Sequence, residues 1–112
     1  MAALTLPPWA PPVLPARRPP ELLADGLLSK ATDVYALGVL VWEMYCGRHA
    51  WAGHSPARII YAVTCAGERL ALPPGAHPPL AALLDACLQT DHTKRPSCAE
   101  IEAALGAMVA AL

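Results

Sequence analysis

The segment Ser29-Lys-Ala-Thr-Asp33-Val-Tyr-Ala-Leu-Gly-Val-Leu-Val-Trp-Glu-Met-Tyr-Cys46-Gly47 decides the fold. From Asp33 to Cys46 the residues are apolar almost all the way round a helix. A helix that is apolar on every side is the central helix of a core rather than a surface helix. Ser29 or Thr32 can cap its start, and Gly47 is placed to end it. Asp33 lies near the positive end of the helix dipole, so the sequence predicts a central helix here.

Three shorter helical patterns follow this segment. Ser55 and Pro56 are typical of an N-cap and the first residue of a helix. After a predicted loop over residues 68–79, apolar residues return at helical spacing, at Leu80, Leu83, Leu84, Cys87 and Leu88. A capping box, Ser97-x-x-Glu100, opens the last helix, whose apolar side carries Ile101, Leu105, Met108 and Leu112. No segment alternates as a strand does, so we predict an all-α fold of four helices.

Composition and charge narrow the function classes. The 112 residues are 55% hydrophobic and 15% charged, which predicts one small domain that is too apolar to be disordered throughout. The net charge is −1 and the basic residues are scattered, so we expect no nucleic-acid surface. The longest apolar run, Val34 to Trp42, is too short to cross a bilayer, and no membrane role is expected. The start has no basic n-region, which argues against a signal peptide and favours the cytoplasm.

The residues that bind metals or move protons form no recognisable pattern. The cysteines form no C-x-x-C pair, and we interpret them as reduced, small core residues: Cys46, Cys65, Cys87 and Cys98. The histidines share no helical spacing and are expected to be solvated: His49, His54, His77 and His92. We interpret Glu43 as a helix-face charge and Glu100 as a capping residue, not as an acid–base pair. The sequence therefore predicts no catalytic, cofactor-binding or metal-binding residue.

The first 20 residues hold seven of the thirteen prolines. This density predicts extended or polyproline-like backbone rather than packed helix. Within it, Pro12-Val-Leu-Pro15-Ala-Arg17 fits the P-x-x-P-x-R pattern of ligands of SH3 domains. We favour a solvated Pro-rich lead-in over an SH3 ligand here, because so short a pattern recurs by chance. We assign residues 1–12 to a Pro-rich leader.

Three stretches, in this order, resemble the protein kinase family. Arg18-Pro-Pro-Glu21-Leu-Leu resembles the A-P-E box that closes the activation segment, with proline in place of its alanine. The stretch from Ser29 to Met44 resembles the long central helix called F, in the form of tyrosine kinases and tyrosine-kinase-like kinases. Cys87-Leu-x-x-Asp91-x-x-x-Arg95-Pro-Ser-x-x-Glu100-Ile resembles the end of the family's domain, with His92 where proline is usual. Together they span about residues 13–105.

The resemblance implies a fold and two structural sites. It implies that residues 13–112 form a partial kinase domain, a helical bundle equivalent to the second half of the C-terminal lobe, behind an irregular Pro-rich N-terminus. In the family, the glutamate of A-P-E forms a buried ion pair with the arginine of R-P-S, which implies a pair between Glu21 and Arg95. The aspartate that begins helix F binds the backbone of the catalytic loop, and Asp33 matches it. The sequence carries no H-R-D motif to receive Asp33.

The resemblance also defines what this chain lacks. Kinase chemistry needs a Gly-rich loop, a strand lysine, the catalytic Asp and Asn, and the D-F-G aspartate that holds magnesium. None of these motifs occurs in the sequence. ATP and magnesium are thus implied only for a complete domain, and this chain alone is predicted to be inactive. Leu14 and Arg17 stand where the family has a threonine and an aromatic residue, which weakens the expectation of substrate docking.

Three interpretations of function stay open. The favoured one is a truncated kinase-like domain without catalytic power. In the second, a longer product supplies the missing half and transfers phosphate from ATP to protein Ser, Thr or Tyr. In the third, the chain is a non-catalytic module that binds a protein partner through Pro12–Arg17 or through the central helix. Without its usual cover, we expect apolar surface at Tyr35, Leu37, Val41 or their neighbours, and a marginally stable chain or one that needs a partner.

Overall fold

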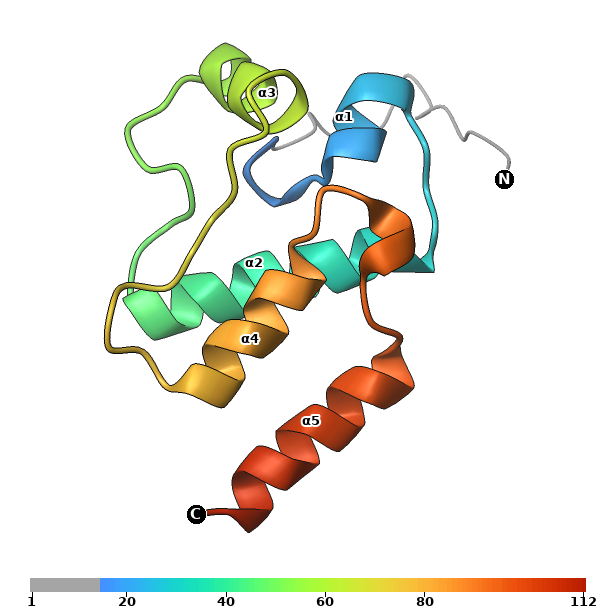
Figure 1. Ribbon diagram of the computed structural model, residues 1–112. Coiled ribbons are helices and arrows are strands. Elements are labelled where there is room, and N and C mark those ends of the chain that lie inside the picture. Colours follow the sequence, from blue (N-terminus) through green and yellow to red (C-terminus); the bar gives the residue numbers. More distant parts are fainter. Residues whose placement is uncertain (1–14) are drawn as a thin grey trace.

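The computed structural model describes residues 15–112, which fold into helices joined by loops (Figure 1). The prediction of an all-α fold is confirmed for this part of the chain. The helices are, in chain order, the 3-10 helix η1 (Pro15–Arg17), α1 (Pro20–Asp25), α2 (Lys30–Cys46), α3 (Pro56–Thr64), α4 (Pro78–Cys87), the 3-10 helix η2 (His92–Lys94) and α5 (Cys98–Ala110).

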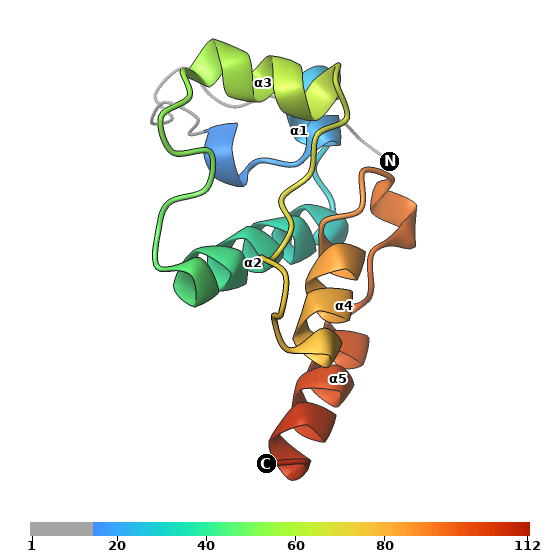
Figure 2. The same cartoon turned by 60° about the vertical axis from the view of Figure 1, so that its left-hand side comes forward.

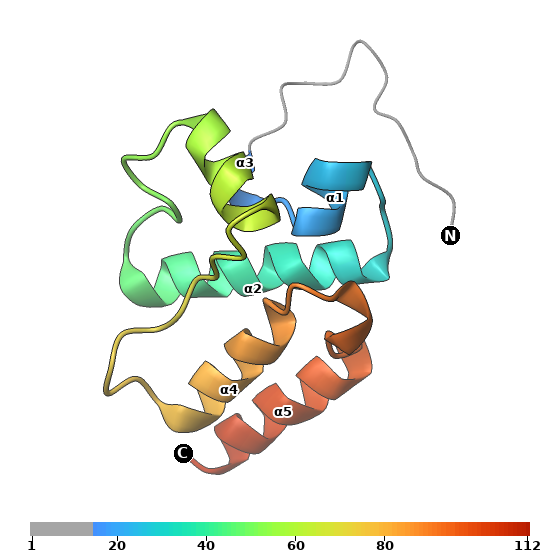
Figure 3. The ribbon, with the colours of Figure 1, turned by 45° about the horizontal axis from the view of Figure 1, so that its top comes forward.

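The long helix α2 is the middle layer of the molecule. In Figures 1 and 3, α1 and α3 lie on one side of α2, while α4 and α5 lie on the other. Helix α3 contacts both α1 and η1, and α2 contacts α4, η1 and η2. Figure 2 shows α5 projecting away from the α3 side, with the C-terminus at its far end. This order confirms α2 as the central helix.

Local sequence sets both ends of α2. The helix begins at Lys30, directly after Ser29, so Ser29 rather than Thr32 occupies the N-cap position. The Thr32 hydroxyl instead accepts a hydrogen bond from the Ser29 backbone N–H at 3.0 Å. Gly47 ends the helix in the left-handed conformation, with φ of 69°, which glycine adopts without steric cost.

The core lies between α2 and α4. Its buried residues are Tyr35, Val39, Trp42, Ala50, Leu84 and Leu88. At Gly38 the two helices approach so closely that a Cβ atom would lie 3.0 Å from the Cβ of Cys87 and 3.2 Å from a methyl group of Leu88. Real Cβ atoms seldom approach other atoms this closely. Glycine therefore permits the spacing of α2 and α4 that closes the core.

Several local predictions are wrong. The short helix α1 was not predicted, because six residues that begin with proline carry little helical periodicity; Pro20 occupies its first position and Gly26 ends it with φ of 68°. Extended backbone was predicted over the first 20 residues, but Pro15–Arg17 form a 3-10 helix. The predicted loop over 68–79 ends early, because α4 begins at Pro78. The leader, residues 1–12, and the start of the Pro12–Arg17 motif lie outside the described residues.

The exposure of several side chains differs from what the sequence predicted. Cys87 is buried, but Cys65 and Cys98 are exposed, so the prediction of core cysteines is wrong for these two. Tyr35 was expected to be exposed and is buried, because its ring faces α4 and Arg95. Leu37 is exposed as expected, at 39%. Within residues 15–112, no helix is both long enough and apolar enough to span a membrane.

Candidate functional site

A buried ion pair joins α1 to the segment between α4 and α5. Glu21, in the first turn of α1, accepts two hydrogen bonds from Arg95: Nη1 to Oε1 at 2.6 Å and Nη2 to Oε2 at 2.9 Å. The side chains are 8% and 0% exposed, respectively. The two parallel bonds use the planar fork of the guanidinium, a geometry that lysine cannot provide. The structure thus brings together the two residues that the resemblance implied as a pair.

Arg95 also contacts other parts of the fold. Its Nε donates to the backbone carbonyl of Gln89 at 2.9 Å, and Nη1 donates to the carbonyl of Ala31 at 3.0 Å. The guanidinium carbon lies 5.0 Å from the centre of the Tyr35 ring, within range of a cation–π contact. Burial raises the pKa of Tyr35 to about 12, and the nearby Arg95 only partly offsets this shift, so the phenol stays neutral. Arg95 therefore ties α1, the start of α2 and the segment after α4 to one another.

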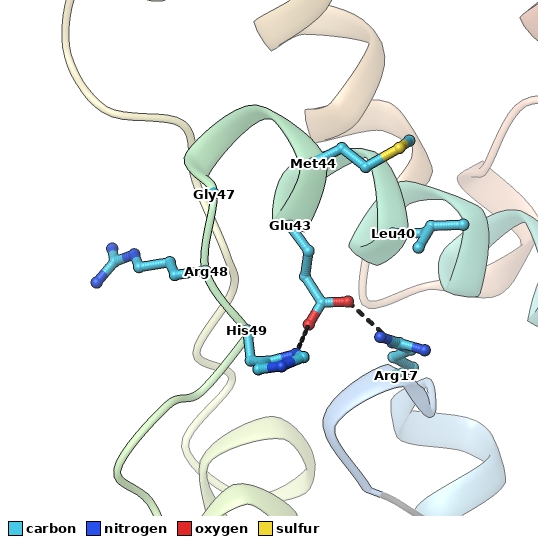
Figure 4. A pocket seen from close by; sticks show the side chains of 7 residues that line it. All are labelled: Arg17, Leu40, Glu43, Met44, Gly47, Arg48 and His49. Atoms are coloured by element: carbon cyan, nitrogen blue, oxygen red, sulfur yellow. Dashed lines mark hydrogen bonds and ion pairs between the residues drawn. The ribbon is translucent and has the colours of Figure 1, made fainter.

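A second carboxylate, that of Glu43, holds the N-terminal segment to the end of α2 (Figure 4). Its Oε1 accepts a hydrogen bond from Arg17 Nε at 2.8 Å. Its Oε2 accepts from the Ala50 backbone N–H at 2.9 Å and lies 3.3 Å from His49 Nδ1. Glu43 is only 9% exposed, whereas the Arg17 and His49 side chains reach solvent. An open pocket of about 300 Å³ lies here, lined by Arg17, Leu40, Glu43, Met44, Gly47, Arg48 and His49.

Glu43 is a charge on a face of α2, as predicted, but the sequence did not indicate that it is buried and paired. Its three partners come from two segments of the chain: Arg17 from η1, and the adjacent residues His49 and Ala50 from the loop after α2. Arg17 lies 26 residues before Glu43, so local helical spacing cannot reveal this partner. A charged residue within the apolar run from Val34 to Tyr45 is the one signal that the sequence offers. His49 is exposed as expected but touches Glu43, and Glu100 forms the capping box predicted with Ser97.

The surroundings of Glu43 favour its ionised form. Burial by itself raises the pKa of this carboxyl group. The hydrogen bonds from Ala50 and Arg17, the charge of Arg17 and the contact with His49 outweigh burial and hold the pKa below its ordinary value of 4.5. A carboxylate that stays ionised in this way suits ion pairing better than proton donation near neutral pH.

Substitution of Glu43 with glutamine should change how stability depends on pH. A lowered pKa stabilises the folded state above the ordinary value of 4.5, and this stabilisation is lost as the pH falls through the folded-state pKa. Glu43→Gln is therefore expected to lower stability at neutral pH and to flatten the acid limb of the stability curve. Urea unfolding from neutral pH down to about pH 3 measures this.

Glu102→Gln, at an exposed carboxylate on α5, is the matched control and should keep the wild-type pH profile. An acid limb that is equally steep in the wild type and in Glu43→Gln would show that Glu43 does not stabilise the fold through its charge.

The geometry suits anchoring rather than catalysis. Asp33 lies in the first turn of α2, is exposed, and finds no hydrogen-bond or ion-pair partner among residues 15–112. Across the same residues, no group of three or more His, Cys, Asp and Glu side chains is arranged to hold a metal ion. Glu21 and Glu43 are each held by an arginine. Both carboxylates fix a segment of chain in place.

Comparison with known proteins places this chain beside protein kinases. The model of the family described as protein tyrosine and serine/threonine kinase matches residues 13–105. The probable serine/threonine-protein kinase SIS8 of Arabidopsis thaliana is 37% identical over 86 residues, which are 77% of this chain and 8% of that protein. The serine/threonine-protein kinase CTR1 of the same plant is 35% identical over 82 residues, 73% of this chain and 10% of CTR1.

A similar match occurs in an animal protein. The mitogen-activated protein kinase kinase kinase of Drosophila melanogaster is 36% identical over 83 residues, which are 74% of this chain and 7% of that protein. The chain thus spans a tenth or less of the length of these three curated relatives.

Proposed function

This chain belongs to the protein kinase family, and from that we propose that it is a part of a kinase domain that does not transfer phosphate by itself. In a complete domain the reaction moves the γ-phosphoryl group of ATP to a protein hydroxyl. We propose that the present chain supplies the helical framework to which the end of the activation segment is fixed.

The Glu21–Arg95 pair carries this proposal. The resemblance puts Glu21 in the box that closes the activation segment and Arg95 near the end of the domain. Two short hydrogen bonds join them in a buried setting, and Arg95 reaches α2 through the Ala31 carbonyl. A segment held in this way keeps its position relative to the central helix. Positioning of this kind is a large part of what a kinase contributes to phosphoryl transfer.

Two observations support inactivity of the chain alone. The sequence contains no G-x-G-x-x-G, H-R-D or D-F-G motif, which supply the phosphate loop, the catalytic base and a magnesium ligand in the family. The buried carboxylates Glu21 and Glu43 are held by arginines and so offer no free pair of acids for magnesium.

ATP with magnesium is expected to leave the melting temperature of this chain unchanged. A ligand raises the melting temperature only when it binds the folded state. Differential scanning fluorimetry with and without millimolar MgATP measures this, and labelled ATP with a peptide mixture tests transfer directly. A complete protein kinase serves as the positive control in both assays. A clear upward shift, or label in the peptides, would contradict the proposed inactivity.

A second proposal concerns an apolar stripe on α2, made of Leu37, Leu40 and Met44. These residues recur at helical spacing and are 39%, 41% and 67% exposed. The stripe continues toward α5 through an open groove of about 420 Å³, lined by Leu37, Cys98, Ile101, Glu102, Leu105, Gly106 and Val109. An apolar surface of this kind marks an interaction site. We propose that an apolar protein surface, from the rest of a longer kinase or from a separate protein, covers it.

Replacing all three stripe residues with serine is expected to reduce the binding of an apolar dye and the self-association of the chain. Fewer exposed apolar side chains leave less surface for either process. Dye fluorescence and light scattering measure the two effects. Tyr61→Ser, at a 61% exposed residue of α3 outside the stripe, is the control and should change both far less. A dilute wild-type chain that melts cooperatively as a monomer and binds no dye would rule out this proposal.

A further inference from the structure

An exposed serine precedes a proline at the start of α3. The sequence there is Ser55-Pro56-Ala57-Arg58, so a basic residue follows three positions after the serine. Of the three serines and five threonines in the whole chain, Ser55 is the only one followed directly by proline. The sequence therefore offers one acceptor to an enzyme that requires proline after the modified hydroxyl.

The local structure presents the hydroxyl of Ser55 to solvent. Every residue from Gly53 to Arg58 is exposed. The Ser55 backbone is extended, with φ of −69° and ψ of 157°, the conformation favoured before proline. Its Oγ accepts one hydrogen bond, from the Arg58 backbone N–H at 3.2 Å. An enzyme thus meets an accessible hydroxyl that is held by a single surface hydrogen bond.

One cationic side chain, that of Arg58, and the positive end of the α3 dipole belong to the same turn as Ser55. The Arg58 side chain donates from Nε to His54 Nδ1 at 2.9 Å, and both side chains are exposed. The described part of the chain gives Arg58 no carboxylate partner. Backbone N–H groups at the start of α3 add the positive end of the helix dipole. A phosphoserine brings about −1.5 to −2 charges, which guanidinium groups and helix N-termini stabilise.

We propose that Ser55 is a phosphorylation site for a proline-directed protein kinase, and that the phosphate caps α3. In the reaction, Ser55 Oγ attacks the γ-phosphorus of an ATP molecule that the modifying kinase binds with magnesium. The new O–P bond forms as the bond from the γ-phosphorus to the bridging oxygen of ADP breaks, and ADP leaves with that electron pair. The hydroxyl proton passes to the catalytic base of that kinase. The phosphate then lies beside Arg58 and the first N–H groups of α3.

Phosphorylation of Ser55 would affect Glu21 and Arg17 through helix α3. This helix buries Ile59, Ala62 and Val63 and contacts both α1 and η1. Helix α1 carries Glu21, and η1 carries Arg17. A phosphate at the N-cap strengthens the helix that packs against both segments. Modification at the surface therefore stabilises the part of the fold that holds the two carboxylate pairs in place.

The first test asks whether and where the phosphate is added. The full chain is incubated with a proline-directed kinase, magnesium and ATP, and mapped by mass spectrometry. One phosphate is expected, on Ser55, and it should be lost in Ser55→Ala and reduced at least tenfold in Pro56→Ala. Ser97→Ala, at the N-cap of α5, is the control and should be modified like the wild type. An unmodified wild type, or equal modification of Pro56→Ala, would overturn the proposal.

The second test asks whether the phosphate caps α3. The second pKa of phosphoserine is about 6 in an unstructured chain, and a phosphorus NMR titration reads it directly. We expect a lower value in the folded phosphorylated chain than in concentrated urea, and Arg58→Ala should move it back toward the urea value. The melting temperature should rise by roughly 2–6 °C on phosphorylation. Equal pKa values in the folded chain and in urea would overturn the capping role.

Discussion

Substitution of Arg95 with alanine is expected to remove a large share of the folding stability of this chain. The change leaves the Glu21 carboxylate buried without a partner and removes the hydrogen bonds to the carbonyls of Gln89 and Ala31. Removing one member of a buried ion pair costs about 3–5 kcal/mol. A small domain has a total stability of about 5–15 kcal/mol, so this loss is a large share of it. Urea unfolding followed by circular dichroism measures the change.

Two further variants separate the buried pair from a general effect of losing an arginine. Arg69→Ala removes a more exposed ion pair with Asp85 and two hydrogen bonds to backbone carbonyls, and should cost much less. Replacing Glu21 with leucine and Arg95 with methionine together should recover much of the stability, because no buried charge is left unpaired. If Arg95→Ala were no more destabilising than Arg69→Ala, the anchoring role of the pair would be wrong.

Substitution of Trp42 with alanine is expected to destabilise the chain by about 3–5 kcal/mol. The Trp42 side chain is 5% exposed and belongs to the core between α2 and α4. Its Nε1 donates to the carbonyl of Ala71 at 2.9 Å, and the Arg48 guanidinium lies 5.3 Å from the ring centre. Removing the ring therefore leaves a cavity and releases two loop segments from α2. Equilibrium unfolding in urea, monitored by circular dichroism, gives the loss.

Trp42→Phe is the matched variant, because it keeps an aromatic ring and removes the indole N–H. It should cost less than the alanine variant, since most of the ring volume is kept and Ala71 is an exposed residue, where water can reach the lost donor's partner. Tyr61→Ala, at an exposed aromatic residue of α3, should change stability by about 0.5 kcal/mol or less. If the Trp42→Ala and Tyr61→Ala variants had the same free energy of unfolding, the core would not depend on Trp42.

The sequence predicted best where a local pattern and the final packing agree. The segment of α2 is apolar all round, and this helix does lie at the centre. Ser97 and Glu100 form a capping box that four residues are enough to reveal. Helix α1 was not predicted, because a six-residue helix is too short to show a clear helical periodicity. Such a helix is stabilised by packing against its neighbours rather than by its own sequence. The exposure of Cys65 and Cys98 depends equally on tertiary packing.

The sequence predicted the ion-pair partner of one anchoring carboxylate, Glu21, but not that of the other, Glu43. Glu21 and Arg95 are 74 residues apart, and only the family resemblance suggested that they meet. For Glu43 neither the resemblance nor the spacing indicated a partner, since Arg17 lies 26 residues earlier and stands where the family has an aromatic residue. An ion pair between distant residues depends on how the whole chain folds, and neither residue carries a local sign of the other.

The long separation within the Glu21–Arg95 pair also has a kinetic meaning. A ribosome adds about 5–20 residues per second, so Glu21 emerges several seconds before the arginine that neutralises it. During that interval the Glu21 carboxylate is hydrated rather than paired, because it pays a desolvation cost only when the fold buries it. Contacts of such high sequence separation form late and slow folding, because the loop they close is long. The Glu21–Arg95 pair is therefore expected to form late in folding, after the helix contacts of shorter sequence separation.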